Sequence, residues 1–364
     1  MRERVTSVPF SSRSCRVALL GFGTVGSAVA HRLTTSDLPP SIHLTHIFDR
    51  RAADKRASAR AANGAPAVLG ESNPDIVWTD RIDDVLQSDA DVVVEAIGGL
   101  EPASTWIRAA LAAGKSVVTA NKQVIARDGA ALRAFAARQG RQLRFEAAVG
   151  GAMPIVRAIA DGLAGDRITR IAGVLNGTTT AVLSRMEETG CSLADALRDA
   201  RARGYAEADP SADIGGDDAR AKLAILCALA FGVRVDPARI PARSAAAITP
   251  EDVAAARQRG AVVRQIAHAR FDRAASTLTA WVAPIEVARD SIFGRTSGAQ
   301  NAAIVTGEHS GDTGIFGSGA GGDATAVAIL SDIAAIARDK AAIVPAPLLT
   351  SNFVLQSSDL EVAC

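Results

Sequence analysis

Residues 16–26 read RVALLGFGTVG, a short apolar run followed directly by glycines in the order G-x-G-x-x-G. The apolar run predicts a buried strand, and the alanines and valines after the glycines predict a helix that extends to about residue 33. In this setting Gly21, Gly23 and Gly26 allow a tight turn, close approach of a pyrophosphate and close helix packing. The helix start supplies free N–H groups for phosphates. The stretch therefore predicts a dinucleotide-binding unit.

A second predicted strand covers residues 43–48 and ends at Asp49, Arg50 and Arg51. An acidic residue at this place bonds the ribose 2′-OH of NAD, whereas a neighbouring arginine suits the 2′-phosphate of NADP. Both residue types are present, so the sequence leaves the choice between NAD and NADP open. A solvated loop is the alternative interpretation of the two arginines.

Further strand patterns follow at residues 91–97, 115–119 and 142–147. Their near-continuous apolar character is typical of parallel strands that are buried on both faces. We expect them to complete a doubly wound first domain. Lys122 comes directly after one of these strands, at the carboxyl edge where such sheets bind ligands. This position favours an active-site role over an ordinary loop lysine.

Composition limits the class of protein. With 364 residues the chain exceeds a usual single core, so two domains are expected. The formal net charge is +1 without a basic run, which argues against a nucleic-acid partner. Apolar runs are too short for a membrane span, and four scattered cysteines suit a reducing, cytoplasmic compartment. Residues 1–14 are polar and predict a disordered extension.

Two motifs in the second half of the chain place polar groups at the predicted starts of helices. Glu146 opens a glycine-rich turn that ends at Pro154, and such a turn places backbone carbonyls beside a carboxylate. Oxygen ligands of this kind suit a hard cation, although a plain strand-to-helix turn is the simpler interpretation. After a predicted strand at residues 168–175, Thr178 and Thr179 offer hydroxyls at the next helix start. Plain helix capping is the alternative there.

The stretch 204–222, GYAEADPSADIGGDDARAK, is the most acidic part of the second half. Its first part predicts a loop and its second part a helix that Asp217 or Asp218 caps. Asp218 and Lys222 then share one helix face. Such a pair is commonly a surface salt bridge, but an apolar run follows Lys222 at once. A lysine at the border of the core is suited to amino-acid recognition or proton transfer.

A second glycine-rich segment, residues 314–322, predicts a loop before a helix that opens near Asp323 or Ala324. A glycine-rich loop before a helix start suits a return to the cofactor. Between these motifs, residues 277–282 predict a strand and residues 250–270 an amphipathic segment.

Taken together, these motifs resemble the homoserine dehydrogenase family, and they occur in the family's order between about residues 15 and 350. The run GYAEADP followed by spaced aspartates and a lysine is highly specific, whereas G-x-G-x-x-G is not. The motifs are GFGTVG (21–26), VVTANK (117–122), FEAAVGGAMPIVRAI (145–159), GVLNGTTT (173–180), GYAEADPSADIGGDDARAKLAIL (204–226) and GSGAGGDATA (317–326).

The resemblance implies NAD(P)-dependent interconversion of L-homoserine and L-aspartate 4-semialdehyde, on the path to threonine and methionine. It implies that Lys222 exchanges the proton of the substrate oxygen, that Lys122 lies beside nicotinamide and substrate, and that Asp218 orients this network. Further implied residues are Glu207, Asp213 and Thr178 for the substrate; Gly21, Phe22, Gly23, Thr24, Val25, Gly26, Asp49, Arg50, Lys122, Gly204 and Gly319 for the cofactor; and Glu146, Val149, Gly151 and Met153 for a sodium ion.

The implied fold class is α/β, with a Rossmann-type doubly wound dinucleotide-binding domain and an α+β substrate and dimerisation domain. We expect the NAD(P)-binding domain at residues 15–146, the substrate domain at 147–318 and a C-terminal return to the first domain at 319–364. The resemblance also implies a homodimer. The chain ends at Cys364 without room for the regulatory domain of longer relatives, so no feedback binding of threonine through such a domain is expected.

Two other functions are compatible with parts of this pattern. One is a dehydrogenase of a different small hydroxy or amino acid, which substrate tests would separate. The other is a catalytically silent NAD(P)-binding sensor, which would be expected to lack Lys122 or Lys222. Both lysines are present.

Overall fold

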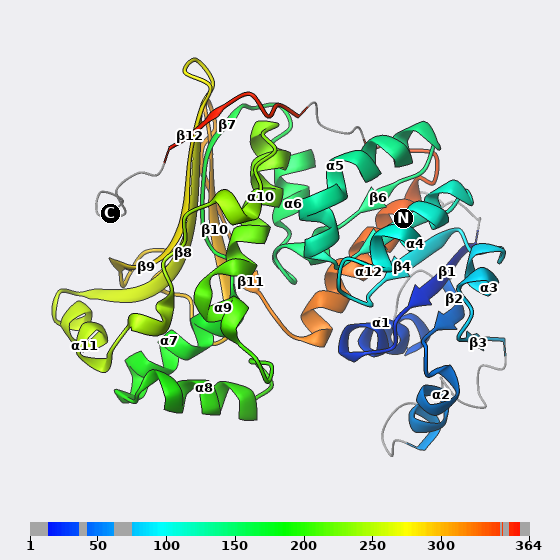
Figure 1. Ribbon diagram of the computed structural model, residues 1–364, viewed down its shortest axis with the longest axis horizontal. Helices are drawn as coiled ribbons and strands as arrows, with labels where there is room; N and C mark the ends of the chain where they lie inside the picture. The colour runs from blue at the N-terminus through cyan, green and yellow to red at the C-terminus, as the bar shows by residue number, and fades with distance from the viewer. Residues whose placement is uncertain (1–13, 36–41, 62–74, 343, 345–348, 357–364) are drawn as a thin grey trace, which may run out of the picture.

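The computed structural model describes residues 14–35, 42–61, 75–342, 344 and 349–356. Two six-stranded sheets form the framework, and helices connect and cover them (Figure 1). The predicted α/β class with a Rossmann-type first domain and a second sheet domain is confirmed. The predicted disordered extension falls almost entirely on residues 1–13, which lie outside the described part of the chain.

The first sheet is parallel throughout and has the strand order β3-β2-β1-β4-β5-β6. This is the order of a doubly wound dinucleotide-binding sheet. Every residue of β4 and β5 is buried, as expected for strands covered on both faces. Its strands are β1 (Cys15–Leu20), β2 (Ile42–Phe48), β3 (Val77–Thr79), β4 (Val92–Glu95), β5 (Ser116–Thr119) and β6 (Leu143–Arg144).

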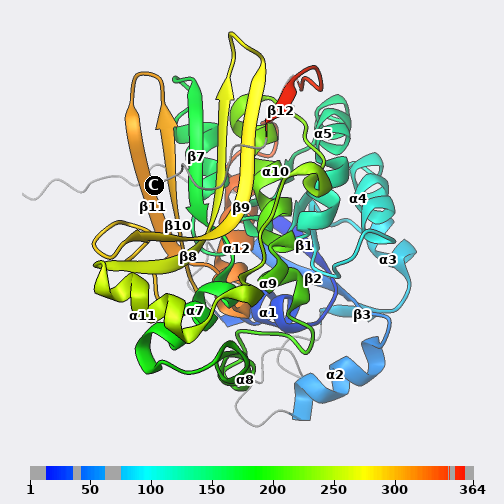
Figure 2. The ribbon, with the colours of Figure 1, turned by 60° about the vertical axis from the view of Figure 1, so that its left-hand side comes forward.

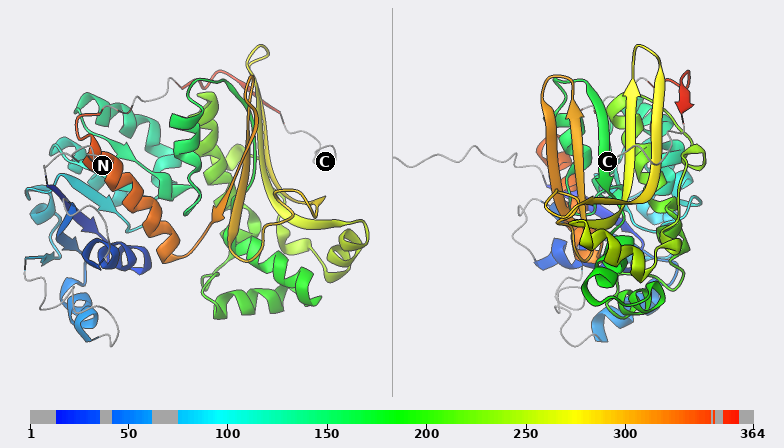
Figure 3. Two further views of the ribbon diagram at one scale, coloured as in Figure 1. Left: turned by 180° about the vertical axis from the view of Figure 1, so that it is seen from behind. Right: turned by 90° about the vertical axis from the view of Figure 1, so that its left-hand side faces the viewer.

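One helix over the first sheet comes from the far end of the chain. Helix α12 (Gly322–Arg338) lies beside α1 (Thr24–Thr35), and its Ile329, Ile333 and Ile336 share one buried cluster with residues of β1, β2 and β4 (Figure 3). The first domain is therefore completed by residues that follow strand β11 of the second sheet. Its other helices are α2 (Ala52–Ala61), α3 (Ile82–Leu86), α4 (Ala103–Ala112) and α5 (Lys122–Arg138).

The second sheet has the order β11-β10-β7-β8-β9-β12, and its strands lie side by side in Figure 2. All neighbours are antiparallel except β9 and β12. The strands are β7 (Ile168–Val174), β8 (Ala261–Asp272), β9 (Thr277–Ala288), β10 (Gln300–Gly307), β11 (Gly311–Ser318) and β12 (Val354–Gln356). The helices of this half are α6 (Ile155–Arg157), α7 (Gly177–Thr189), α8 (Leu193–Ala202), α9 (Ser211–Gly215), α10 (Asp217–Phe231) and α11 (Pro250–Gln258).

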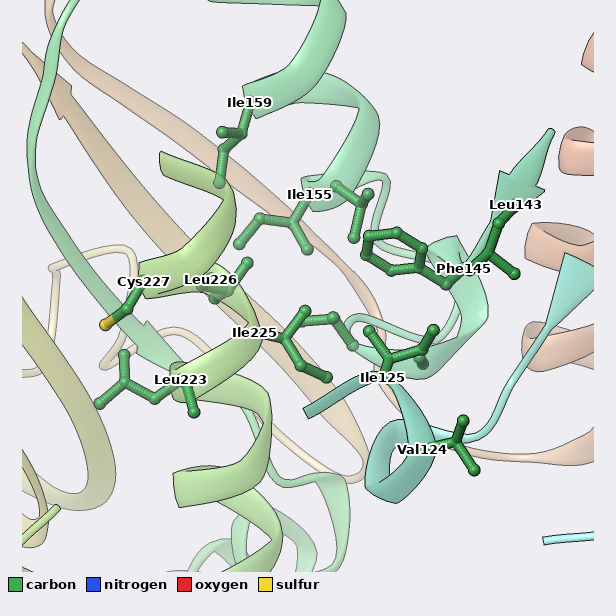
Figure 4. Packing of buried hydrophobic residues seen from close by; sticks show 14 of the residues in the cluster. Val124, Ile125, Leu143, Phe145, Ile155, Ile159, Leu223, Ile225, Leu226 and Cys227 are labelled. Carbon is green, nitrogen blue, oxygen red and sulfur yellow. The ribbon is translucent and has the colours of Figure 1, made fainter. Parts of the chain in front are cut away.

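Helix α10 joins the two halves through one continuous core. Leu223 and Leu226 are fully buried, and Ile225 belongs to the same cluster as Ile125 of α5 and Ile155 of α6 (Figure 4). Burying side chains of this size stabilises by about 1.5–3 kcal/mol each. The core therefore packs α10 against the start of α5. Lys122 is the first residue of α5, and Lys222 lies in the second turn of α10.

Three local predictions are wrong. The strand expected at residues 142–147 is only β6, and a 3₁₀ turn, Glu146–Ala148, replaces its end because Glu146 turns inward to meet α6 and α12. The glycine-rich segment 314–322 is not all loop, since pairing with β10 makes its first part strand β11. The cap of α10 is Gly216, with φ of 92°, and neither Asp217 nor Asp218 caps it.

The described chain contains no helix that is both long and apolar enough to cross a membrane.

Candidate active site

The loop between β1 and α1 forms a cradle that only glycine permits at two positions. Gly21 has φ of 95°, and a Cβ there would lie 2.8 Å from the carbonyl oxygen of Ala96. A Cβ at Gly26 would lie 2.0 Å from the carbonyl oxygen of Gly21. At Gly23, in contrast, no atom lies within 4 Å of the Cβ position, so space remains above the loop. The cradle and the start of α1 fit a bound pyrophosphate.

A cavity of about 680 Å³ opens over this loop, a size that suits a small-molecule site. The residues that line it come from the carboxyl ends of β1, β2 and β4 and from α4. They include Gly21, Phe22, Gly23, Asp49, Arg50, Arg51, Lys55, Ala96, Ile97, Gly98 and Trp106. The predicted cofactor residues of the first two strands therefore share one cavity.

Asp49 is held by the backbone at the mouth of this cavity. One carboxylate oxygen accepts the N–H of Phe22 at 3.0 Å, and the other accepts the N–H of Arg51 at 2.9 Å. Burial alone would raise the pKa of Asp49, but these N–H groups, with Lys55 and Arg51 nearby, lower it. The carboxylate thus stays ionised while three cationic side chains, including Arg50, line the same cavity.

Glu95 ties together the two loops at the carboxyl edge of the sheet. It is fully buried, and it accepts the N–H groups of Ile97 at 2.9 Å and Gly98 at 3.2 Å and the hydroxyl of Thr119. Thr119 in turn accepts the N–H of Asn121 at 2.9 Å. The loop that lines the cavity and the loop that precedes Lys122 are therefore held by one carboxylate.

Lys122 and Lys222 meet on the carboxylate of Asp218. Lys122 is the first residue of α5, which Asn121 caps, and its Nζ pairs with Oδ1 of Asp218. Lys222 Nζ lies 2.9 Å from Oδ2 and donates to the carbonyl oxygen of Leu175 at 2.8 Å. The side chain of Lys122 is 40% exposed and that of Lys222 only 11%. One buried carboxylate therefore holds two cations from different domains.

Asp218 and Lys122 both stay ionised, because each stabilises the charge of the other. Burial alone would raise the pKa of Asp218, but the ammonium groups of Lys222 and Lys122 hold it well below its usual value. Burial alone would lower the pKa of Lys122. The negative charge of Asp218, with smaller contributions from Asp213 and Glu207, outweighs burial, so the pKa is raised. Lys122 therefore remains a cation throughout the physiological range.

Asp213 is the second carboxylate at the site. Burial raises the pKa of Asp213, and the like charge of Asp218 adds to this, against a hydrogen bond from Asn176 and the charges of both lysines. Asn176 was not predicted as a site residue. Its side chain donates to Asp213 at 2.7 Å and to Asp218 at 2.8 Å. The only sequence signal was its position between a strand and a helix within GVLNGTTT.

The remaining predicted substrate residues lie at the edge of this cluster. Glu207 is exposed in the loop before α9, and its charge acts on Lys122. Thr178 is buried, and its hydroxyl donates to the carbonyl oxygen of Tyr205 at 2.7 Å, which ties α7 to the acidic loop. Gly204 precedes that loop with φ of 74° and is exposed. Thr178 thus holds the loop backbone.

The predicted cation turn lies beside the second glycine-rich loop. A Cβ at Gly151 would lie 2.8 Å from the carbonyl oxygen of Gly319, and one at Gly150 would lie 2.3 Å from that of Met153. Val149 and Met153 are buried. The turn therefore packs closely against the backbone of the second glycine-rich loop.

Glu146 itself faces a helix start. Its carboxylate accepts the N–H groups of Val156 and Arg157, each at 2.8 Å, and its own N–H donates to Asp332 of α12 at 2.9 Å. Burial raises its pKa to about 7, against those N–H groups. Its side chain is engaged by the helix, so ligands for a cation would come from backbone carbonyls. Among the described residues, histidine, cysteine and carboxylate side chains form no cluster suited to a metal.

Most of the predicted catalytic, substrate and cofactor residues fall into two groups, the lysine cluster and the loop between β1 and α1 with its cavity. Lys122, Lys222, Asp218 and Asp213 form one hydrogen-bonded and ion-paired cluster, and Glu207 acts on it through its charge. The first-domain cofactor residues line the cavity or begin α1. The start of α12 lies against the start of α1, because a Cβ at Gly322 would lie 3.0 Å from the carbonyl oxygen of Thr24.

Comparison with known proteins gives consistent matches. The family model described as homoserine dehydrogenase matches residues 154–334, and that described as homoserine dehydrogenase, NAD binding domain, matches residues 21–146. The chain is 38% identical over 347 residues to homoserine dehydrogenase of Mycobacterium tuberculosis, which covers 92% of this chain and 74% of the relative. With that of Corynebacterium glutamicum the identity is 36% over 327 residues, covering 89% and 72%.

Solved structures agree with the sequence matches. A homoserine dehydrogenase from Thiobacillus denitrificans superimposes with a TM-score of 0.82 at 33% identity, covering 95% of this chain and 80% of that one. A hyperthermophilic archaeal homoserine dehydrogenase in complex with NADPH has a TM-score of 0.72 at 26% identity, covering 91% and 100%.

Proposed function

We propose a catalytic mechanism for this chain, which belongs to the homoserine dehydrogenase family. It is an NAD(P)-dependent oxidoreductase that interconverts L-homoserine and L-aspartate 4-semialdehyde. We place this reaction in threonine and methionine biosynthesis. The observation that carries the mechanism is the meeting of Lys122 and Lys222 on the buried Asp218, because it sets a proton-exchanging group beside a fixed cation.

In this mechanism Lys222 exchanges the proton of the substrate oxygen. Its Nζ has three donor positions, of which Asp218 and the Leu175 carbonyl use two, so one remains for the substrate. When bound, the nicotinamide accepts or supplies the hydride at the substrate carbon. In the oxidising direction a neutral Lys222 takes the hydroxyl proton, and in the reducing direction the ammonium returns it.

Lys122 has a different role, because its raised pKa keeps it charged. A fixed ammonium beside the reacting oxygen stabilises negative charge that develops there. It lies one residue from Asn121, whose side chain donates to the carbonyl oxygen of Gly99 at 2.7 Å, next to the cofactor cavity. Lys122 is therefore suited to contact both substrate and cofactor.

The experiment compares Lys222→Met with Lys122→Met in both reaction directions. Loss of a general acid–base group lowers kcat by roughly 10²- to 10⁴-fold, and we expect this of Lys222→Met with little change in cofactor affinity. Lys340→Met is the matched control for losing an ion-paired lysine away from the site, since Lys340 pairs with Asp91 at 3.0 Å. If Lys222→Met retains wild-type kcat, the mechanism is wrong.

We propose that Asp213 and Glu207 hold the ammonium group of homoserine. The charges of both act on Lys122, and Asn176 links Asp213 directly to Asp218. Thr178 fixes the loop through Tyr205, and we propose that its backbone also contacts the substrate. Homoserine analogues without the amino group should lose most of their affinity, and a KM equal to that of homoserine would refute this assignment.

We propose that NADP is preferred over NAD. Asp49, the residue that would bond the 2′-OH of NAD, already accepts the N–H groups of Phe22 and Arg51. Arg50, Arg51 and Lys55 line the same cavity and suit a 2′-phosphate. The ratio of kcat/KM for NADP to that for NAD should fall in Arg50→Ala, and an unchanged ratio would contradict the proposal.

We further propose a sodium ion at the turn formed by Glu146, Val149, Gly151 and Met153, held by backbone carbonyl oxygens. The buried turn and its close approach to Gly319 support this. Sodium chloride should raise thermal stability more than choline chloride at equal ionic strength. Equal stability in the two salts would leave no support for the site.

We propose a homodimer that forms through the outer face of the second sheet. Phe316 of the edge strand β11 is 71% exposed, whereas its neighbour Ile315 packs toward the core. A large exposed aromatic side chain on a sheet face suits a partner surface. A monomeric mass in solution at micromolar concentration would refute it.

We also propose the domain boundaries stated above, 15–146, 147–318 and 319–364, and a cytoplasmic location. The contacts of α12 with the first sheet support the last boundary. Cys15, Cys191 and Cys227 are free thiols in the structure, which suits a reducing compartment. Limited proteolysis tests the domain boundaries, and cell fractionation tests the cytoplasmic location.

A further inference from the structure

Asn176 occupies a position between the two carboxylates of the site. It lies two residues after the end of β7 and caps α7, and only 3% of it is exposed. A neutral amide carries two N–H donors. One donates to Oδ1 of Asp213 at 2.7 Å and the other to Oδ2 of Asp218 at 2.8 Å. The amide therefore bridges two acids that belong to different helices, α9 and α10.

The orientation of this amide is fixed by its third contact. Oδ1 of Asn176 accepts the N–H of Thr179 at 2.7 Å, as the cap of α7. If the amide were turned over, its oxygen would face two carboxylates and its NH₂ group would face an N–H. Both N–H donors and the amide oxygen thus find partners in one arrangement only, so the helix cap aims the two donors at Asp213 and Asp218.

The two acids need such a bridge because their environments differ. Asp218 accepts both lysines and is held ionised, whereas Asp213 has no ion pair in the described chain and feels the like charge of Asp218. The charged groups that act on them are Lys122 from α5 and Lys222 from α10, and Glu207 of the acidic loop acts on Lys122. Asn176 is the neutral donor among these charges.

We infer that Asn176 is a positioning residue for the dehydrogenase reaction. Its amide holds the substrate-binding acid Asp213 at a fixed place relative to Asp218 and its two lysines, so that the bound amino acid presents its oxygen to Lys222. The inference rests on the roles proposed above for Asp213 and Lys222. It assigns to Asn176 no contact with the substrate.

Two variants test this role. Asn176→Ser retains a helix-capping hydroxyl but removes both donors, and Asn176→Asp keeps the shape and the capping oxygen but adds a third negative charge. Removing hydrogen bonds to charged groups at this strength should lower kcat/KM for homoserine by roughly 10- to 100-fold in Asn176→Ser, through both KM and kcat. The dissociation constant for NADP should not change, because the first-domain cavity is intact.

The pH profile separates a positioning role from a purely structural one. In Asn176→Asp a third carboxylate beside Asp213 disfavours ionisation of Asp213, so the acidic limb of kcat/KM should move to higher pH by about one unit or more. In Asn176→Ser, loss of the N–H donor to Asp213 should move the acidic limb in the same direction, but by a smaller amount than in Asn176→Asp. Ser192→Ala, which removes the cap of α8 away from the carboxylates, is the control for cap loss and should keep the wild-type profile.

Each outcome decides the inference. Wild-type kinetics and pH profile in both Asn176 variants would overturn it, and so would loss of NADP binding in both, which would show a structural role. If Asn176→Asp does not fold, Asn176→Ser alone decides. Failure of the underlying mechanism is distinguishable, because it would appear as wild-type kcat in Lys222→Met.

Discussion

Replacing Asp218 by asparagine should destabilise the protein in a pH-dependent manner. The substitution keeps the shape of the side chain but removes the charge that both lysines share. At 2.9 Å and an effective dielectric constant of about 20, the attraction between Asp218 and Lys222 alone is about 6 kcal/mol. The net loss is smaller, because burying the carboxylate also has a cost.

The free energy needed to deprotonate an unpaired lysine sets an upper limit to this loss of stability. A lysine without its partner can become neutral, which at pH 7.5 costs about 4 kcal/mol relative to an ordinary pKa of about 10.4. We therefore expect Asp218→Asn to lower the free energy of unfolding by about 3–4 kcal/mol at pH 7.5. Near pH 10 neutralisation costs less than about 1 kcal/mol, so the deficit should shrink.

The sign of this pH dependence is set by proton binding. In the variant, the folded state binds fewer protons than the unfolded state below about pH 10.4, so its stability rises with pH. In the wild type the raised pKa of Lys122 contributes stability below the unfolded pKa, and this is lost as pH rises through the folded value. Between pH 7.5 and pH 10 the rising stability of the variant narrows the difference in unfolding free energy, and loss of the Lys122 contribution in the wild type adds to this only above about pH 10.4.

Chemical unfolding followed by tryptophan fluorescence at both pH values measures this difference. Asp217→Asn is the matched control, because Asp217 is 57% exposed and pairs with Arg220 on its own helix. Its effect should stay within about 0.5 kcal/mol. Wild-type stability of Asp218→Asn at pH 7.5, or a deficit that is the same at pH 7.5 and pH 10, would refute the reasoning.

Three further predictions concern other parts of the site. Because the pKa of Asp213 is raised, kcat/KM for homoserine should fall in acid at a higher pH than an ordinary aspartate gives, and Asp213→Asn should abolish this limb in pH–rate profiles. Gly319→Ala places a Cβ 2.2 Å from Asn301, so calorimetry should show a melting temperature lower by several degrees. Glu95→Ala leaves the N–H groups of Ile97 and Gly98 without their acceptor, so stability should fall by about 2–3 kcal/mol and titration should show weaker NADP binding; unchanged affinity would contradict it.

The parts of the fold that the sequence predicts are those with local signals. The strand, glycine loop and helix around Gly21 are specified by neighbours in the chain, and the structure confirms them. The pairing of Asp218 with Lys222 is also local, because four residues bring two side chains onto one helix face. Contacts between residues that lie close together in the sequence can therefore be predicted from the sequence.

Contacts between distant segments were not predictable in the same way. Asn176 reaches Asp213 and Asp218 across 37 and 42 residues, and its own segment contains no sign of those partners. The sequence predicts a loop where β11 lies because Gly314 and Gly317 resemble turn residues, and only pairing with β10 makes it a strand. In both cases the tertiary fold decides what the local pattern leaves open.

Helix α12 has a consequence for the order in which the chain can fold during synthesis. The first domain's sheet is complete by Arg144, yet the apolar face that receives Ile329 and Ile333 stays uncovered until α12 has left the ribosome. At roughly 5–20 residues per second, the roughly 180 intervening residues take on the order of 10–40 seconds. During that interval the nascent dinucleotide domain presents a bare hydrophobic surface, so chaperone protection should matter most for this half of the molecule.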